Sequence, residues 1–91
     1  MKLHDLADAI LKTRTVETRC DAAFKFADAM LRNGSSITDT AEATYRIVMR
    51  GNKAYRLNKD DAWRITAHAY AEQLAEREVA TVLAQMAGGA E

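Results

Sequence analysis

The sequence contains no proline, one cysteine and only four glycines among 91 residues. Because proline and glycine are the residues that most often interrupt helices, their scarcity leaves long stretches free to be helical. Alternation of apolar and polar residues, which is typical of strands, is nearly absent, whereas alanine is abundant. These features predict an all-α protein.

Long hydrophobic runs and an excess of charge are also missing. Lys, Asp or Arg interrupts every apolar run before it reaches the length of a membrane span or a signal-peptide core. Thirteen basic side chains balance thirteen acidic ones, so the net charge alone does not favour nucleic acid or an anionic membrane as partner. With Cys20 as the single cysteine, no intrachain disulfide can form. We therefore predict a cytoplasmic protein with no membrane partner.

The length and composition are those of one ordinary globular domain. Hydrophobic residues make up 48% of the chain and charged residues 29%, which predicts a single folded domain over residues 1–91 with one modest core. Apolar residues recur at three- and four-residue spacing in four segments, approximately 3–12, 16–32, 37–50 and 59–86. The prediction is a small four-helix bundle with a long C-terminal helix, along which the three shorter helices pack.

The ends of these segments carry the expected signals. Thr13 or Thr15, Ser36 and Asn58 are candidate N-caps. Gly34, Gly51 and the pair of Gly88 and Gly89 are candidate C-terminal stops. The helical segments are therefore bounded by turns of a few residues.

The long segment carries two apolar stripes, one after the other. Trp63, Ala67, Tyr70 and Leu74 form the first stripe, which we expect at the centre of the core. The second stripe begins where the first one fails, and consists of Ala71, Ala75, Val79, Val82 and Met86, joined by Leu83.

Three arrangements account for this shift between stripes. The final turns pack against the first helix after a slight rotation, or the helix bends near residues 76–78, or its end projects beyond the bundle. In the third case Val79, Val82, Leu83 and Met86 would contact a partner or a second copy of the chain.

One segment is strongly basic. It contains Arg46, Arg50, Lys53, Arg56 and Lys59 with no acidic residue among them, and Tyr55 lies between two of these cations. Such a group is typical of a surface that binds phosphates or an acidic protein face. The alternative is a solvated rim that pairs with Asp39, Glu42, Asp60 and Asp61.

Residues for catalysis or metal binding are few. His4, His68 and Cys20 belong to no recognised motif, and the pair His68 and Glu72 is not completed by a second pair of metal ligands. Cys20 lies on an apolar helix face, where it resembles a small core residue. We predict no enzyme activity, no catalytic residue, no cofactor and no metal.

The predicted function is non-enzymatic binding of a larger macromolecule, as an adaptor or inhibitor, through the basic segment, the C-terminal helix end or both. A protein or a protein–nucleic-acid complex is the expected partner. Small neutral helical proteins without motifs are often carried by phages and mobile elements, for example as inhibitors of host defence nucleases, and such an origin is one hypothesis. The alternatives are a regulatory protein that binds DNA or RNA through residues 46–59, and a structural homodimer.

Overall fold

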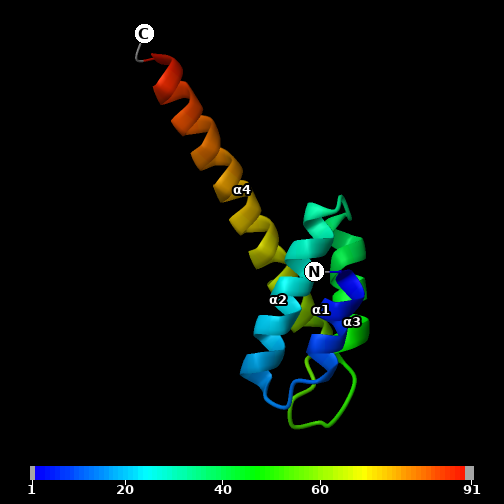
Figure 1. Cartoon of the computed structure of the whole chain (residues 1–91). Coiled ribbons are helices and arrows are strands. Elements are labelled where there is room, and N and C mark those ends of the chain that lie inside the picture. Colours follow the sequence, from blue (N-terminus) through cyan, green and yellow to red (C-terminus); the bar gives the residue numbers. More distant parts are fainter. Residues whose placement is uncertain (1, 90–91) are drawn as a thin grey trace.

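The computed structural model describes residues 2–89 and contains four helices joined by short connections (Figure 1). They are α1 (Leu3–Leu11), α2 (Val16–Arg32), α3 (Ile37–Val48) and α4 (Lys59–Gly89). Residues 2–89 contain no β-strand, so the predicted all-α class and the four helical segments are confirmed. None of these helices combines the length and the apolar character that a membrane crossing requires.

Side-chain caps fix the helix starts where the sequence predicted them. The Thr15 hydroxyl accepts a hydrogen bond from the Thr18 amide at 3.1 Å, and the Ser36 hydroxyl accepts one from Asp39 at 3.0 Å. At the start of α4 the cap is reciprocal. The Asn58 side chain accepts from the Asp61 amide at 2.8 Å, and the Asp61 carboxylate accepts from the Asn58 amide at 3.1 Å. These bonds satisfy amides that lack a partner within the helix.

Helices α2 and α3 form the centre of the bundle, because each of them contacts all the other helices. Helices α1 and α4 contact α2 and α3 but not each other: no Cα atom of α1 lies within 8 Å of one in α4. The prediction that all three shorter helices pack along the last one was therefore wrong for α1. The main core cluster consists of Leu6, Ile10, Ala23, Phe26, Val48, Leu57 and Ala62.

The buried face of α4 is not the predicted one. Ala62, Thr66, Ala69 and Gln73 are buried, whereas Trp63 and Tyr70 are half-buried and Ala67 and Leu74 are exposed. The expectation that the Trp63 to Leu74 stripe forms the core centre was therefore wrong. The reason lies in α3, which packs against α4 and whose buried face is made of Thr40, Ala41, Thr44 and Val48. Small residues on both helices allow close packing, and an indole ring between them would hold the helices apart.

The end of α4 projects from the bundle (Figure 1). Gln73 is the last buried residue of the helix, and every side chain described from residue 74 to residue 88 is exposed. We refer to residues 74–89 as the α4 arm. It gives the molecule a length of 59 Å against widths of 25 and 22 Å. Of the three arrangements considered for the second stripe, the structure has the projecting one, with one continuous helix from Lys59 to Gly89. The stop predicted at Gly88 and Gly89 was wrong, because both glycines are helical; glycine weakens a helix but does not forbid it.

Candidate functional site

Three surfaces carry the residues that the sequence singled out: the α4 arm, the basic segment and a groove between α2 and α4. The arm is held at its base by polar contacts from α2. The Gln73 amide donates to the Asp28 backbone carbonyl at 2.9 Å and to the Asp28 carboxylate at 2.8 Å. Arg32 bridges the same carboxylate at 3.0 Å and Glu76 at 2.9 Å. Side chains of α2 thereby hold α4 at the point where the arm leaves the bundle.

The contacts at the arm base also change the acidity of Asp28. Partial burial opposes its ionisation, but the hydrogen bonds from Gln73 and Arg32, with the charge of Arg32, outweigh burial and lower the pKa of Asp28 below its ordinary value. The carboxylates of Asp28 and Glu76 in turn raise the pKa of Arg32. Asp28 and Arg32 are therefore both charged at neutral pH.

Beyond this base, the arm exposes a line of apolar side chains. The exposed fraction is 57% for Val79, 47% for Val82, 60% for Leu83 and 66% for Met86. With Ala75, these residues form what we define as the apolar stripe. Shallow grooves flank it, one bounded by Glu72, Glu76 and Leu83 and the other by Glu78, Val82 and Leu83. The residues predicted for a contact on the arm are thus available to a partner along one face of a helix.

The arm is also unusual in where its charges lie. Its charged side chains are Glu76, Arg77 and Glu78, all close to the bundle, and residues 79–89 contain none. The outer part of the arm therefore offers only apolar contacts and the neutral polar groups of Thr81 and Gln85.

The basic segment is exposed. Arg46, Arg50, Lys53, Arg56 and Lys59 are all exposed, and we refer to them as the basic surface. None of the ion pairs formed within residues 2–89 involves these five side chains, so the pairing considered with Asp39, Glu42, Asp60 and Asp61 is not observed. Lys53 and Arg56 border a shallow hollow floored by Tyr45, Met49 and Leu57.

Tyr55, which the sequence grouped with these cations, is half-buried and contacts another residue. The guanidinium carbon of Arg19 lies 4.9 Å from the centre of its ring, within the range of a cation–π contact. One face of the tyrosine is therefore occupied from inside the protein.

Arg19 is the residue that the sequence reasoning missed. Only 1% of its surface is exposed, although it is an arginine. Its guanidinium donates to the Val48 carbonyl at 2.9 Å, to the Arg50 carbonyl and to the Ile10 carbonyl at 3.3 Å, and its Nε donates to the Thr13 hydroxyl at 2.9 Å.

These acceptors lie at the C-terminal ends of α1 and α3, where the helix dipole is negative and carbonyls lack helical partners. A single cation thereby joins two helix ends to the first turn of α2. The available signal was the spacing of Arg19 from Ala23, Phe26 and Ala27, which places it on the buried face of α2.

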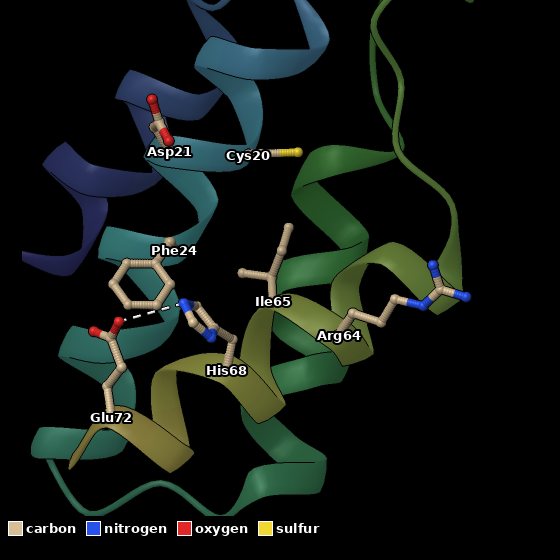
Figure 2. Close-up of a pocket in the computed structure, with 7 residues that line it drawn as sticks. All are labelled: Cys20, Asp21, Phe24, Arg64, Ile65, His68 and Glu72. Atoms are coloured by element: carbon tan, nitrogen blue, oxygen red, sulfur yellow. Dashed lines mark ion pairs between the residues drawn. The ribbon is translucent and has the colours of Figure 1, made fainter. Parts of the chain in front are cut away.

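A groove between α2 and α4 contains Cys20 and His68, which were considered from the sequence for catalysis or metal binding (Figure 2). Phe24 and Cys20 come from α2, and Ile65, His68 and Glu72 come from α4. His68 Nε2 lies 3.3 Å from a Glu72 oxygen, and its ring centre is 5.3 Å from that of Phe24. Burial, followed by the charges of Asp61 and Asp21, raises the pKa of Cys20, so its thiol is protonated at neutral pH.

The histidine of this groove lies at the surface of the protein. The side chain of His68 is 66% exposed, and among the residues that the structure describes no three His, Cys, Asp or Glu side chains lie together as metal ligands would. Glu72 borders both this groove and one of the two grooves along the α4 arm. The two surfaces are therefore continuous along one side of α4.

The chain was compared with protein-family models, with curated protein sequences and with solved structures, and none of the three comparisons found a match.

Proposed function

We propose that this chain is a non-enzymatic binding protein, an adaptor or inhibitor, which engages another polypeptide through the α4 arm. The observation that carries the proposal is the apolar stripe, exposed on a helix that extends beyond the bundle. Its four large side chains expose on the order of 400 Å², the size of the largest apolar patch on a typical monomer, which is often functional.

The physical state of the arm supports the same role. A helix of this length without packing partners is marginally stable in water, because few of its contacts compensate the loss of chain entropy. Burial of the stripe against a groove or another helix removes its apolar side chains from water and stabilises the helix at the same time. The neutral thiol of Cys20 and the exposure of His68 favour binding over catalysis as the role of the adjoining groove.

A photocrosslinking experiment in the cells that naturally express the protein tests this proposal. Benzoylphenylalanine at position 82 places the reactive group in the stripe, and at position 84 it places the group about 200° around the same exposed helix. We expect crosslinked protein adducts from position 82 and few from position 84. Equal yields from the two positions, or none from either, would contradict a binding role for the stripe.

The basic surface supports a second candidate function, the binding of DNA or RNA. Its five cations are exposed and outside every ion pair of residues 2–89, so no side-chain carboxylate competes with phosphate. If all five contact phosphates, the affinity for a short DNA duplex falls about 500-fold between 50 and 200 mM salt.

Fluorescence anisotropy with a labelled 20-base-pair duplex measures that dependence. Lys53→Glu is the test variant. Lys25→Glu is its control, because Lys25 is an exposed lysine in the middle of α2, outside the basic surface, and the substitution changes the net charge equally. Lys53→Glu weakens binding and flattens the salt slope, whereas Lys25→Glu has little effect. Affinity that is independent of salt, or equal in the two variants, would rule out this function.

A further inference from the structure

We propose that the polypeptide which covers the apolar stripe is a second copy of this chain, paired antiparallel, with the two-fold axis passing between residues 80 and 81. The inference rests on the proposed binding role of the α4 arm and adds the identity, direction and register of the partner.

The spacing of the stripe is the first argument. Ala75, Val79, Val82 and Met86 are separated by four, three and four residues, a pattern that is the same when read from either end. Alternating steps of four and three keep residues on the seam between two paired helices. In an antiparallel pair, Ala75 then lies opposite Met86 of the second copy and Val79 opposite Val82 of the second copy. Every member of the line has an apolar partner.

The distribution of charge selects the direction. In the antiparallel pair, Glu76 lies beside Leu83 of the second copy and Glu78 lies beside Gln85, because the outer part of each arm is uncharged. In a parallel pair, Glu72 continues the line one step before Ala75 and would face Glu72 of the second copy. Like charges at such a position are destabilising, so the parallel arrangement is disfavoured.

Charge also selects the register among antiparallel pairs. If the second copy is shifted by seven residues toward the bundle, the apolar residues still lie between the two helices. This shift, however, brings Glu76 of one copy against Glu76 of the other, and Glu78 against Glu78. The unshifted register avoids both contacts. It places Gly89 of the second copy opposite Glu72, where the arm leaves the bundle, so the whole exposed length of each arm is covered.

The area involved predicts a reversible dimer. With neighbouring alanines and glycines included, two arms would bury on the order of 1,000 Å² in total, at the lower end of specific interfaces. Association also carries the entropic cost of ordering two chains, so we expect a dissociation constant in the micromolar range. The dimer therefore forms and separates with protein concentration.

The pairing explains how so small a protein can act as an adaptor. The basic surface lies near the end of α4 that is farthest from the tip of the arm (Figure 1). An antiparallel pair therefore carries two bundles, and two basic surfaces, at the opposite ends of a rod. At 1.5 Å per residue, the two overlapping α4 helices span about 66 Å.

Disulfide trapping tests the direction and register. Two variants, Ala75→Cys and Met86→Cys, are prepared in a Cys20→Ser background and oxidised with diamide, separately and as a mixture. Both positions are in the exposed arm, so the bundle is unaffected. Positions 75 and 86 of two copies face each other in the proposed pair, whereas two copies of position 75 are about 16 Å apart, beyond the reach of a disulfide.

We expect the mixture to give a disulfide between the two different variants and each variant alone to give little. Disulfides formed by each variant alone would show a parallel pair and overturn the antiparallel one. No disulfide in any sample up to about 500 µM protein would overturn self-pairing. In that last case, adducts with other proteins from position 82 in the photocrosslinking experiment would leave the proposed binding function standing, and their absence would remove both proposals.

Discussion

Replacement of Arg19 is the perturbation with the largest expected effect on the bundle. Arg19→Ala removes a buried side chain, four hydrogen bonds and a cation–π contact with Tyr55. The loss is smaller than the sum of these contacts, because two of the three carbonyls keep another donor. Leu57 donates to Val48 at 2.9 Å, and Thr13 donates to Ile10. The Arg50 carbonyl keeps no other donor among the hydrogen bonds of residues 2–89.

From these contacts we expect Arg19→Ala to lower the free energy of unfolding by about 3 kcal/mol, since a hydrogen bond from a charged group contributes ~1.5–3 kcal/mol and a void remains. For a domain of this size that is a large fraction of the total, and the melting temperature would fall by roughly 12–24 °C. Arg19→Lys keeps the charge but lacks the planar fork that reaches both helix ends, so it should recover only part of the loss.

Urea unfolding followed by circular dichroism at 222 nm measures these changes. Arg14→Ala is the control, because Arg14 is an exposed arginine five residues away and its removal should change stability by less than about 0.5 kcal/mol. A loss below about 1 kcal/mol in Arg19→Ala, with an unchanged dependence on urea, would refute the role of Arg19 as the joint between α1, α2 and α3.

Three further predictions concern the bundle. In thermal melts, Gly51→Ala should destabilise the protein more than Gly34→Ala. Both glycines have positive φ, but only at Gly51 would the new methyl group lie 3.0 Å from an aromatic ring, that of Tyr55. Equal losses of stability would contradict this. Thr44→Val should leave stability unchanged or raise it by up to ~1 kcal/mol, because the buried Thr44 hydroxyl has no hydrogen-bond partner in the described chain. Thr66→Val should lower stability, because it removes the 2.9 Å hydrogen bond from the Thr66 hydroxyl to the Ala62 carbonyl. The opposite order of stabilities would be inconsistent with these contacts. Folding lowers the pKa of Asp28, so the contribution of this carboxylate to the free energy of unfolding is complete above its ordinary pKa of 3.8 and is lost as the pH falls through the lower folded value. Asp28→Asn should therefore make stability less dependent on pH in this acidic range, as measured by acid unfolding. An unchanged pH dependence would argue against the network at the arm base.

Local signals in the sequence were sufficient for the elements of the fold. The caps at Thr15, Ser36 and Asn58 and the left-handed glycines at positions 34 and 51 depend on a few neighbouring residues, and all five behave as predicted. Such signals do not depend on how helices pack. These helix boundaries could therefore be read without knowledge of the tertiary structure, whereas the stop predicted at Gly88 and Gly89 was not observed, because α4 continues through both glycines.

Packing was less predictable, because it depends on the partner helix. Trp63 and Leu74 have the side chains that best suit a core, yet the face of α4 that is buried against α2 and α3 consists of Ala62, Thr66, Ala69 and Gln73. The burial of Arg19 likewise depends on two helix ends that meet only in the folded chain. Whether the second stripe lies on an exposed arm depends on the length of α4 relative to the bundle. From the sequence, the projecting arm was only one of three possible arrangements.

Sedimentation equilibrium over roughly 1–500 µM protein tests most directly whether the apolar stripe is an interface. Three chains are compared: the natural protein, Val82→Glu in the stripe, and Ala84→Glu with the same charge on the opposite side of the arm. The antiparallel pair predicts that the natural protein and Ala84→Glu shift from the mass of one chain to that of two, while Val82→Glu remains a single chain. A natural protein that stays monomeric throughout, or a Val82→Glu variant that dimerises equally well, would contradict the proposed interface.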